Sequence, residues 1–263
     1  DGRTWHERFR VPCAATIADL AVSPAPMPSV LLATTRGLYA SFDGGRQWVL
    51  AFRGIGEVDA ACTVVAFHAS DSSRAIAGTA NGLWASADGG RTWRLVDLPP
   101  ATRQVVDAAF APEDPDRVYV ITTHGLFSGH LTEGGWQQRY ARVRAEEEAV
   151  EEPEVLEAIE TNGENGSLHH LSAIAVDPAD GSTLYLATSQ GLEVSLDRGM
   201  TWRAAAQQSI GLGAITRLVL QAHSPVVVYA ATGREIAQYE PRRERWTALS
   251  NGFVASRIHD LAG

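Results

Sequence analysis

The chain has 263 residues, of which 45% are hydrophobic and 20% are charged, and its formal net charge is −9 at pH 7. This composition supplies enough apolar material for a large core and argues against a disordered chain. The basic residues are all arginine. The acidic excess disfavours broad binding to nucleic acids, and no apolar run is long enough to insert into a membrane. The first residues do not read as a signal peptide.

Cofactor chemistry has little support in the sequence. A chain without lysine has neither a P-loop lysine nor a side-chain amine for a Schiff base. The adjacent His169 and His170 would point to opposite sides of a strand, which does not favour chelation of one metal. Cys13 and Cys62 lack metal-ligand spacing, and they are equally compatible with one disulfide or with two buried thiols. We expect neither a metal nor another cofactor.

An internal repeat is the strongest signal in the chain. Six of the seven tryptophans are separated by 43, 45, 43, 66 and 44 residues, and they are Trp5, Trp48, Trp93, Trp136, Trp202 and Trp246. Three of them end the related segments SFDGGRQW (41–48), SADGGRTW (86–93) and SLDRGMTW (195–202), and degenerate copies end at Trp136 and Trp246. A period of this size indicates a repeat architecture.

Each repeat also contains short runs rich in β-branched and aromatic residues, bounded by Gly, Asp and Pro, which predict four strands per unit. Such a unit cannot bury both of its faces alone, whereas radial packing of several units can. The sequence therefore predicts an all-β, single-domain β-propeller over residues 1–263, with an acidic inserted loop at about 143–168. We expect six blades, the last closed by N- and C-terminal strands, and five blades are the alternative.

The order of the motifs resembles the Asp-box (BNR) repeat family, and within it the sortilin and photosystem II assembly-factor type of propeller. The resemblance implies that each Asp-box forms the turn between the third and fourth strands, away from the centre. The residues assigned this structural role are Asp43, Trp48, Asp88, Trp93, Asp197 and Trp202. A short carboxylate suits such a turn because it can accept hydrogen bonds from backbone amides. The resemblance also favours an extracytoplasmic location.

Two sets of residues are candidates for function. The inner strands carry, at one register position, Asp19, Val64, Asp107, Ala173, Arg217 and Asp260, and strand alternation places this position toward the centre. Asp19, Asp107 and Asp260 are therefore candidates for a catalytic pair on a glycosidic bond. The alternative is a structural role in which these carboxylates pair with Arg217.

The second set follows the second strand of each repeat, where the residue type varies while its neighbours repeat: Arg36, Asn81, His124, Gln190 and Arg234. Exposed loops on a rigid scaffold are frequent binding sites, so these residues, with Arg217, are expected to contact a partner. The favoured function is a non-enzymatic scaffold that binds a protein or peptide, and the acidic insertion favours a basic partner segment. A glycoside hydrolase or a carbohydrate-binding propeller is the alternative.

Overall fold

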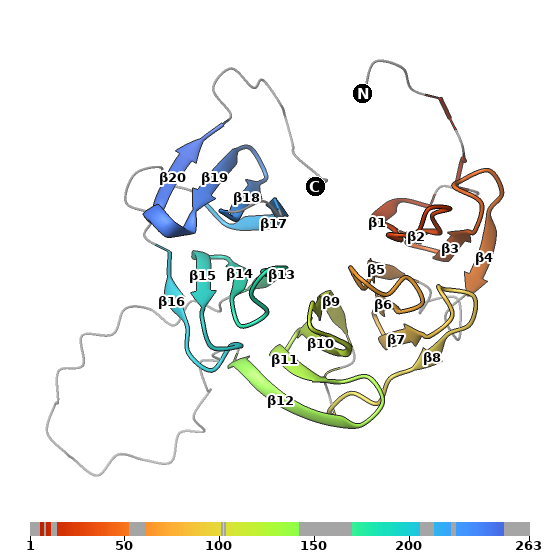
Figure 1. Ribbon diagram of the computed structural model, residues 1–263, viewed down its shortest axis with the longest axis horizontal. Coiled ribbons are helices and arrows are strands. Elements are labelled where there is room, and N and C mark those ends of the chain that lie inside the picture. Colours follow the sequence, from red (N-terminus) through yellow and green to blue (C-terminus); the bar gives the residue numbers. More distant parts are fainter. Residues whose placement is uncertain are drawn as a thin grey trace, which may run out of the picture.

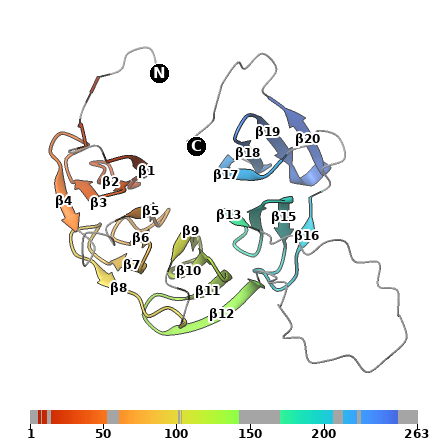
Figure 2. The same cartoon turned by 180° about the vertical axis from the view of Figure 1, so that it is seen from behind.

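The computed structural model describes residues 6–7, 9–11, 15–52, 61–100, 102, 104–141, 170–205, 213–221 and 225–249. These residues form five separate four-stranded antiparallel sheets, each built from consecutive strands. The sheets follow one another around a centre in chain order, and the first and last sheets lie at the two ends of the arc (Figure 1 and Figure 2). The all-β propeller prediction is confirmed, and the five complete sheets agree with the alternative blade count.

The strands occupy equivalent places in every sheet. The inner strands, which line the centre in Figure 1, are β1 (Ile17–Val22), β5 (Cys62–Phe67), β9 (Val105–Ala111), β13 (Leu171–Val176) and β17 (Ile215–Gln221). The second strands are β2 (Val30–Thr34), β6 (Ala75–Thr79), β10 (Asp114–Thr122), β14 (Leu184–Thr188) and β18 (Val227–Thr232). The third strands are β3 (Gly37–Ser41), β7 (Gly82–Ser86), β11 (Gly125–His130), β15 (Gly191–Ser195) and β19 (Ile236–Glu240). The outer strands are β4 (Val49–Phe52), β8 (Arg94–Leu95), β12 (Gly134–Ala141), β16 (Arg203–Ala204) and β20 (Arg245–Ala248).

The hydrophobic core lies between the sheets. Four clusters of buried side chains fill the four interfaces between consecutive sheets, here called seams. The second and third strands supply most of the buried residues in three of the four clusters because both of their faces are covered, as for Leu31 and Leu38, which have no exposed surface. At the seam between the second and third sheets, Gly78 allows close approach, since a Cβ there would lie 2.5 Å from Val105 Cγ1.

Every inner strand contains a bulge near its start. The pairing register shifts between the first and third residues of the strand in each of the five sheets, as between Ile17 and Asp19. A bulge leaves one residue out of the ladder and redirects the neighbouring side chains. In the first four sheets, side chains at the second or third position of the inner strand thereby reach the next sheet, as for Asp19, Thr63, Asp107 and Ser172.

Several sequence predictions lie outside the described residues. These are the acidic insertion at 143–168, the strand containing Asp260, Trp5, and Cys13. Cys62 is a buried free thiol, and burial raises its pKa to about 12. No helix in the described part of the chain is long and apolar enough to cross a membrane.

Candidate functional site

The central carboxylates bridge neighbouring sheets. Asp19 Oδ1 accepts a hydrogen bond from the amide of Leu20 at 2.8 Å, and its Oδ2 accepts one from the amide of Val65 in the second sheet at 2.8 Å. Asp107 repeats this arrangement, with its own neighbour Ala108 at 2.9 Å and Ile174 of the fourth sheet at 2.8 Å. Both oxygens of each carboxylate therefore hold backbone amides, one of them across a seam.

The two remaining seams are bridged by hydroxyls at the preceding strand position. Thr63 Oγ1 lies 2.9 Å from the carbonyl oxygen of Val105 in the third sheet, to which it can donate, and 3.1 Å from that of Gly78 in its own sheet. Ser172 Oγ makes the equivalent contact with Ile215 of the fifth sheet, at 2.5 Å. Carboxylate and hydroxyl bridges thus alternate from seam to seam. Sequence reasoning missed the hydroxyls, although their position directly before the aligned Asp19 and Asp107 register could have revealed them.

Asp107 titrates near neutral pH. Burial raises its pKa to about 7 against the lowering effect of the amides of Ile174 and Ala108, while the charge of Asp19 raises it further and Arg217 lowers it. Part of the side chain still faces a small central cavity. A carboxyl group with this pKa could donate a proton at physiological pH, which is the property that a general acid needs.

The central cavity has a volume of about 190 Å³, and its lining includes Asp19, Asp107, Arg217, Thr63, Val65 and Ile174. The structure thus brings together five of the six residues of the predicted central register, namely Asp19, Val64, Asp107, Ala173 and Arg217, while Asp260 lies outside the described part. The cavity is smaller than the roughly 300–1,000 Å³ usual for small-molecule sites. Among the described residues, no group of three or more His, Cys, Asp or Glu side chains could hold a metal ion.

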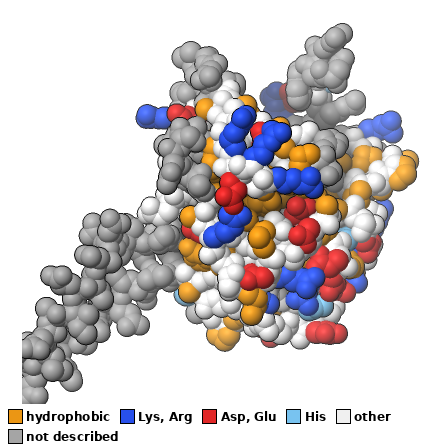
Figure 3. Space-filling view, turned by 60° about the vertical axis from the view of Figure 1, so that its left-hand side comes forward, with side chains coloured by type: hydrophobic (Ala, Val, Ile, Leu, Met, Phe, Trp, Pro, Cys, Tyr) orange, Lys and Arg blue, Asp and Glu red, His pale blue; other side chains and the backbone are white. Residues whose placement is uncertain are grey.

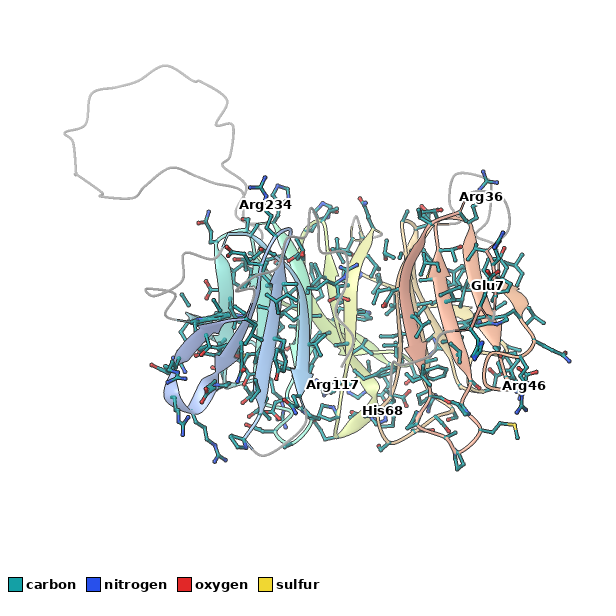
Figure 4. All side chains as sticks on the ribbon, turned by 90° about the horizontal axis from the view of Figure 1, so that it is seen from above. Glu7, Arg36, Arg46, His68, Arg117 and Arg234 are labelled. Carbon is teal, nitrogen blue, oxygen red and sulfur yellow. The ribbon has the colours of Figure 1, made fainter. Side chains whose placement is uncertain are left out.

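The five variable turn residues are exposed and share one face of the molecule. Arg36, Asn81, His124, Gln190 and Arg234 each follow a second strand, and all five side chains belong to exposed residues. Figure 4 shows Arg36 and Arg234 at one end of the strands, and Arg46, Arg117 and His68 toward the other end. We call the first end the turn face. Because consecutive strands are antiparallel, the connections between sheets begin and end at this same face.

A repeated threonine fixes each of these turns. Thr34 Oγ1 donates to the carbonyl oxygen of Gly37 at 2.7 Å and accepts from the amide of Arg36 at 3.1 Å. The same pair of bonds occurs at Thr79, Thr122, Thr188 and Thr232. The same threonine bonds hold all five turns, while the displayed side chain changes. In four turns the next residue is a glycine with positive φ, namely Gly37, Gly82, Gly125 and Gly191, whereas the fifth turn has Glu235 there and differs in backbone.

The aspartate segments lie at the other end of the strands. Asp43 accepts hydrogen bonds from the amides of Arg46 and Gln47 and from the Ser41 hydroxyl, and these bonds lower its pKa. Asp88 and Asp197 make equivalent bonds, and Thr201 and Ser195 hold the pKa of Asp197 at about 2. Trp48, Trp93 and Trp202 each donate through Nε1 to a glycine carbonyl of the same turn. All of these groups are engaged in local structure.

A larger pocket, of about 540 Å³, lies where the fifth sheet lacks the aspartate segment. A 3₁₀ turn, η1 (Pro241–Arg243), stands in its place. The pocket is lined by residues of the fourth and fifth sheets that include Tyr185, Leu196 and Arg203. Figure 3 shows this side of the molecule, where arginine and acidic side chains are interspersed, as in the Arg203–Glu244 and Arg243–Glu240 pairs. The degenerate motif at Trp246 was the only sequence signal for this pocket.

Comparison with solved structures supports the propeller fold. An ancestral GH74 enzyme matches with a TM-score of 0.66 and 18% identity, covering 92% of this chain and 32% of that one. The GH74 xyloglucanase from Xanthomonas campestris matches with a TM-score of 0.66 and 17% identity, covering 89% and 37%. A chain of a nidogen/laminin complex matches with a TM-score of 0.62 and 10% identity, covering 89% and 79%.

The chain therefore spans about a third of the length of the two GH74 chains. At these identities the likeness shows the fold alone. No curated protein matches the sequence. A family model described as "Beta-prop_HVO_0234:-like, beta propeller" matches residues 11–149, which is more than half of the chain. The chain belongs to this HVO_0234-like beta-propeller family.

Proposed function

We propose that this propeller is a non-catalytic scaffold that binds a protein or peptide on its turn face. The observation that carries the proposal is the set of five exposed side chains, displayed by turns that the same threonine bond holds in every sheet. A rigid scaffold with variable loops is a common design for recognition. The sequence pattern also supports membership of the Asp-box repeat family, within its sortilin-like group. This resemblance in turn favours an extracytoplasmic location.

The chemistry of the centre favours the same proposal. Both oxygens of Asp19 and of Asp107 accept backbone amides, so holding the sheets together accounts for these carboxylates without catalysis. The chemistry of the partner follows from charge. The inserted segment at 143–168 is rich in glutamate and joins two strands at the turn face, which favours a partner with a basic segment.

Fluorescence anisotropy with labelled peptides of graded arginine content tests this proposal. We expect a basic peptide to bind more tightly than an acidic peptide of equal length, with an affinity that falls as salt rises. A variant with alanine at Asn81, His124 and Gln190, which keeps the charges of Arg36 and Arg234 unchanged, should lose at least about tenfold in affinity, which corresponds to 1.4 kcal/mol. The matched control, Arg46→Ala with Gln47→Ala, changes exposed residues at the opposite end and should bind as the wild type does. Equal loss in both variants would contradict binding at the turn face.

Glycoside hydrolysis is the second candidate. The observation that favours it is the pKa of Asp107, about 7, in a fold shared with a xyloglucanase. An assay of xyloglucan hydrolysis with the wild type and Asp107→Asn decides between the two functions. Turnover that the substitution abolishes would establish the enzyme, whereas no turnover by the wild type is expected if the protein is a scaffold.

A further inference from the structure

The pocket of about 540 Å³ marks a difference between the fifth sheet and the sheets that carry an aspartate segment. Residues 239–246 align with the aspartate segment 195–202, but they have Pro241 in place of the aspartate. The hydroxyl of Tyr239 and Nε1 of Trp246 are buried without a hydrogen-bond partner in the described part of the chain. The tryptophans of the three aspartate segments donate to a glycine carbonyl instead. The bonds that close those segments are therefore missing in the fifth sheet.

The second glycine of the aspartate segment lies against the preceding sheet at two of the seams. A Cβ on Gly90 would lie 2.9 Å from Leu31 Cδ2 of the first sheet. A Cβ on Gly199 would lie 3.1 Å from Arg139 Cβ of the third sheet. The fifth sheet has Arg243 at this position, with a side chain that is 72% exposed. An arginine does not fit where a Cβ is already crowded, so the space beside the fourth sheet is left open.

Asp177 brings an acidic side chain to this pocket from the fourth sheet. It lines the pocket and is only 8% exposed. Its Oδ1 accepts the amides of Ala179 and Asp180 at 2.8 and 3.3 Å, whereas its Oδ2 has no hydrogen-bond or ion-pair partner among the described residues. A buried carboxylate is costly unless a donor or a cation pairs with it. The second oxygen of Asp177 therefore favours a positively charged ligand group.

The equivalent residue of the second sheet shows which way this oxygen faces. His68 and Asp177 both follow an inner strand directly. The Nδ1 of His68 accepts the amide of Asp71 at 3.1 Å, so Nε2 carries the hydrogen and donates to the carbonyl oxygen of Ala111 in the third sheet at 3.2 Å. The Oδ2 of Asp177 takes the place of Nε2, toward the fifth sheet. Because a carboxylate cannot donate this bond, it is left as an acceptor for an external donor.

The first seam contains a cation at the place that is open in the pocket. The guanidinium of Arg91, in the second sheet, lies 4.3 Å from the ring centroid of Phe42 in the first. Leu196 has the position of Phe42 in the fourth sheet, lines the pocket and is 59% exposed. The fifth sheet has Glu244 at the position of Arg91, and this carboxylate pairs with Arg203. The fifth sheet thus supplies no equivalent cation to cover Leu196.

The size of the pocket and its other charges narrow the ligand further. A volume of about 540 Å³ is within the range of roughly 300–1,000 Å³ that is usual for small-molecule sites. Both oxygens of Asp180 accept hydrogen bonds, from Ser182 and Thr183, and these bonds lower its pKa. Arg203 is held in an ion pair, and Arg242 is exposed. Asp177 is therefore the charge in this lining that a ligand would neutralise.

We propose that this pocket binds a small molecule that carries a protonated amine on an apolar body. The amine lies at Asp177 Oδ2, and the apolar body covers Leu196 beside Tyr185, which also lines the pocket. The pocket lies at the end of the strands that carries the aspartate segments, opposite to the turn face. The inference therefore does not depend on the proposed function of that face.

Isothermal titration calorimetry of the full chain with phenethylamine tests the proposal. We expect saturable binding of one molecule per chain. Phenylacetate has the same ring but a negative charge, and it should show no binding at the same concentrations, because Asp177 repels it. A wild type that does not bind phenethylamine, or that binds both compounds equally, would overturn the proposal.

Asp177→Asn is the variant that tests the position of the amine. Asparagine can still accept the amides of Ala179 and Asp180 through its oxygen, so the turn is retained. We expect this variant to bind phenethylamine at least about tenfold more weakly than the wild type. Asp97→Asn removes the same charge from an exposed residue of the second sheet and should bind as the wild type does. An unchanged affinity in Asp177→Asn would contradict the proposed site.

Hydrogen exchange of the wild type provides a test that needs no substitution. Saturating phenethylamine should slow exchange of the Ala179 and Asp180 amides at least about threefold, because the bound amine fixes the carboxylate that accepts them. The Ser70 and Asp71 amides, which His68 accepts in the second sheet, should exchange as before. Equal rates with and without the amine at Ala179 and Asp180 would overturn the site.

A capped lysine separates a small molecule from the side chain of a protein partner. Nα-acetyl-lysine methylamide carries the same charged group on a side chain without a ring. We expect it to bind more weakly than phenethylamine, because it covers less of the apolar wall. Tighter binding of the capped lysine would overturn the proposal of a small-molecule ligand, in favour of a lysine of a partner.

Discussion

Carboxylates bridge two of the seams and hydroxyls bridge the other two. Both satisfy a backbone polar group of the following sheet, but the carboxylates accept a hydrogen bond and the hydroxyls donate one. At the first and third inner strands, Asp19 and Asp107 accept an amide of the following sheet. At the second and fourth, Thr63 and Ser172 reach a carbonyl oxygen of the following sheet. A buried backbone group needs a partner whichever kind it is. The difference is that only the carboxylate seams carry a charge, so only they should respond to pH.

The largest effect expected from this difference is the pH dependence that Asp107 confers. Its pKa is about 7 in the folded protein, above the value of 3.8 for an unperturbed aspartate. Between these values the folded state binds a proton that the unfolded state has lost, so the free energy of unfolding falls as pH rises. Across the whole pH window this change in the free energy of unfolding is at most about 4 kcal/mol. Water that enters the central cavity makes the change smaller.

Urea unfolding of the wild type and Asp107→Asn between pH 4 and pH 8 checks this. Asparagine keeps an oxygen acceptor and cannot ionise, so the stability of the wild type relative to the variant should decline steadily across the window. Thr63→Val, in a seam without a titrating bridge, is the control and should leave the pH dependence of the wild type unchanged. A constant difference between the wild type and Asp107→Asn would contradict the raised pKa.

How far this arrangement could be predicted differs between its parts. The strands, their order in each sheet and the turns at Thr34 and its equivalents followed from the repeat, because local motifs determine them. The register that grouped Asp19, Asp107 and Arg217 at the centre was also visible in the sequence. The bulge was not, since it exists only once the inner strand pairs with the second strand. Without the bulge, the side chain of Thr63 could not be assigned to a seam.

A smaller loss of stability should follow from removing the other carboxylate bridge. Asp19→Ala leaves the amides of Leu20 and Val65 without the acceptor that they have in the wild type. Asp19 is only half-buried, so water can replace part of the lost bonding, and we expect a loss of about 2 kcal/mol in the free energy of unfolding. Asp19→Asn, which retains one side-chain oxygen as an acceptor, should recover part of this loss. Chemical denaturation of these variants at one pH measures the effect. An Asp19→Ala variant as stable as the wild type would show that this bridge is dispensable.

The smallest effects are expected from the hydroxyls of the inner strands. Thr63→Val replaces the hydroxyl by a methyl group of similar shape, and it should lower the free energy of unfolding by about 1 kcal/mol, the net value of a typical hydrogen bond. Thr216 is exposed and reaches only Ala231 of its own sheet among the described residues, so Thr216→Val should cost less than Thr63→Val. Urea unfolding of the two variants at one pH checks this order, and an equal loss of stability in both would contradict it.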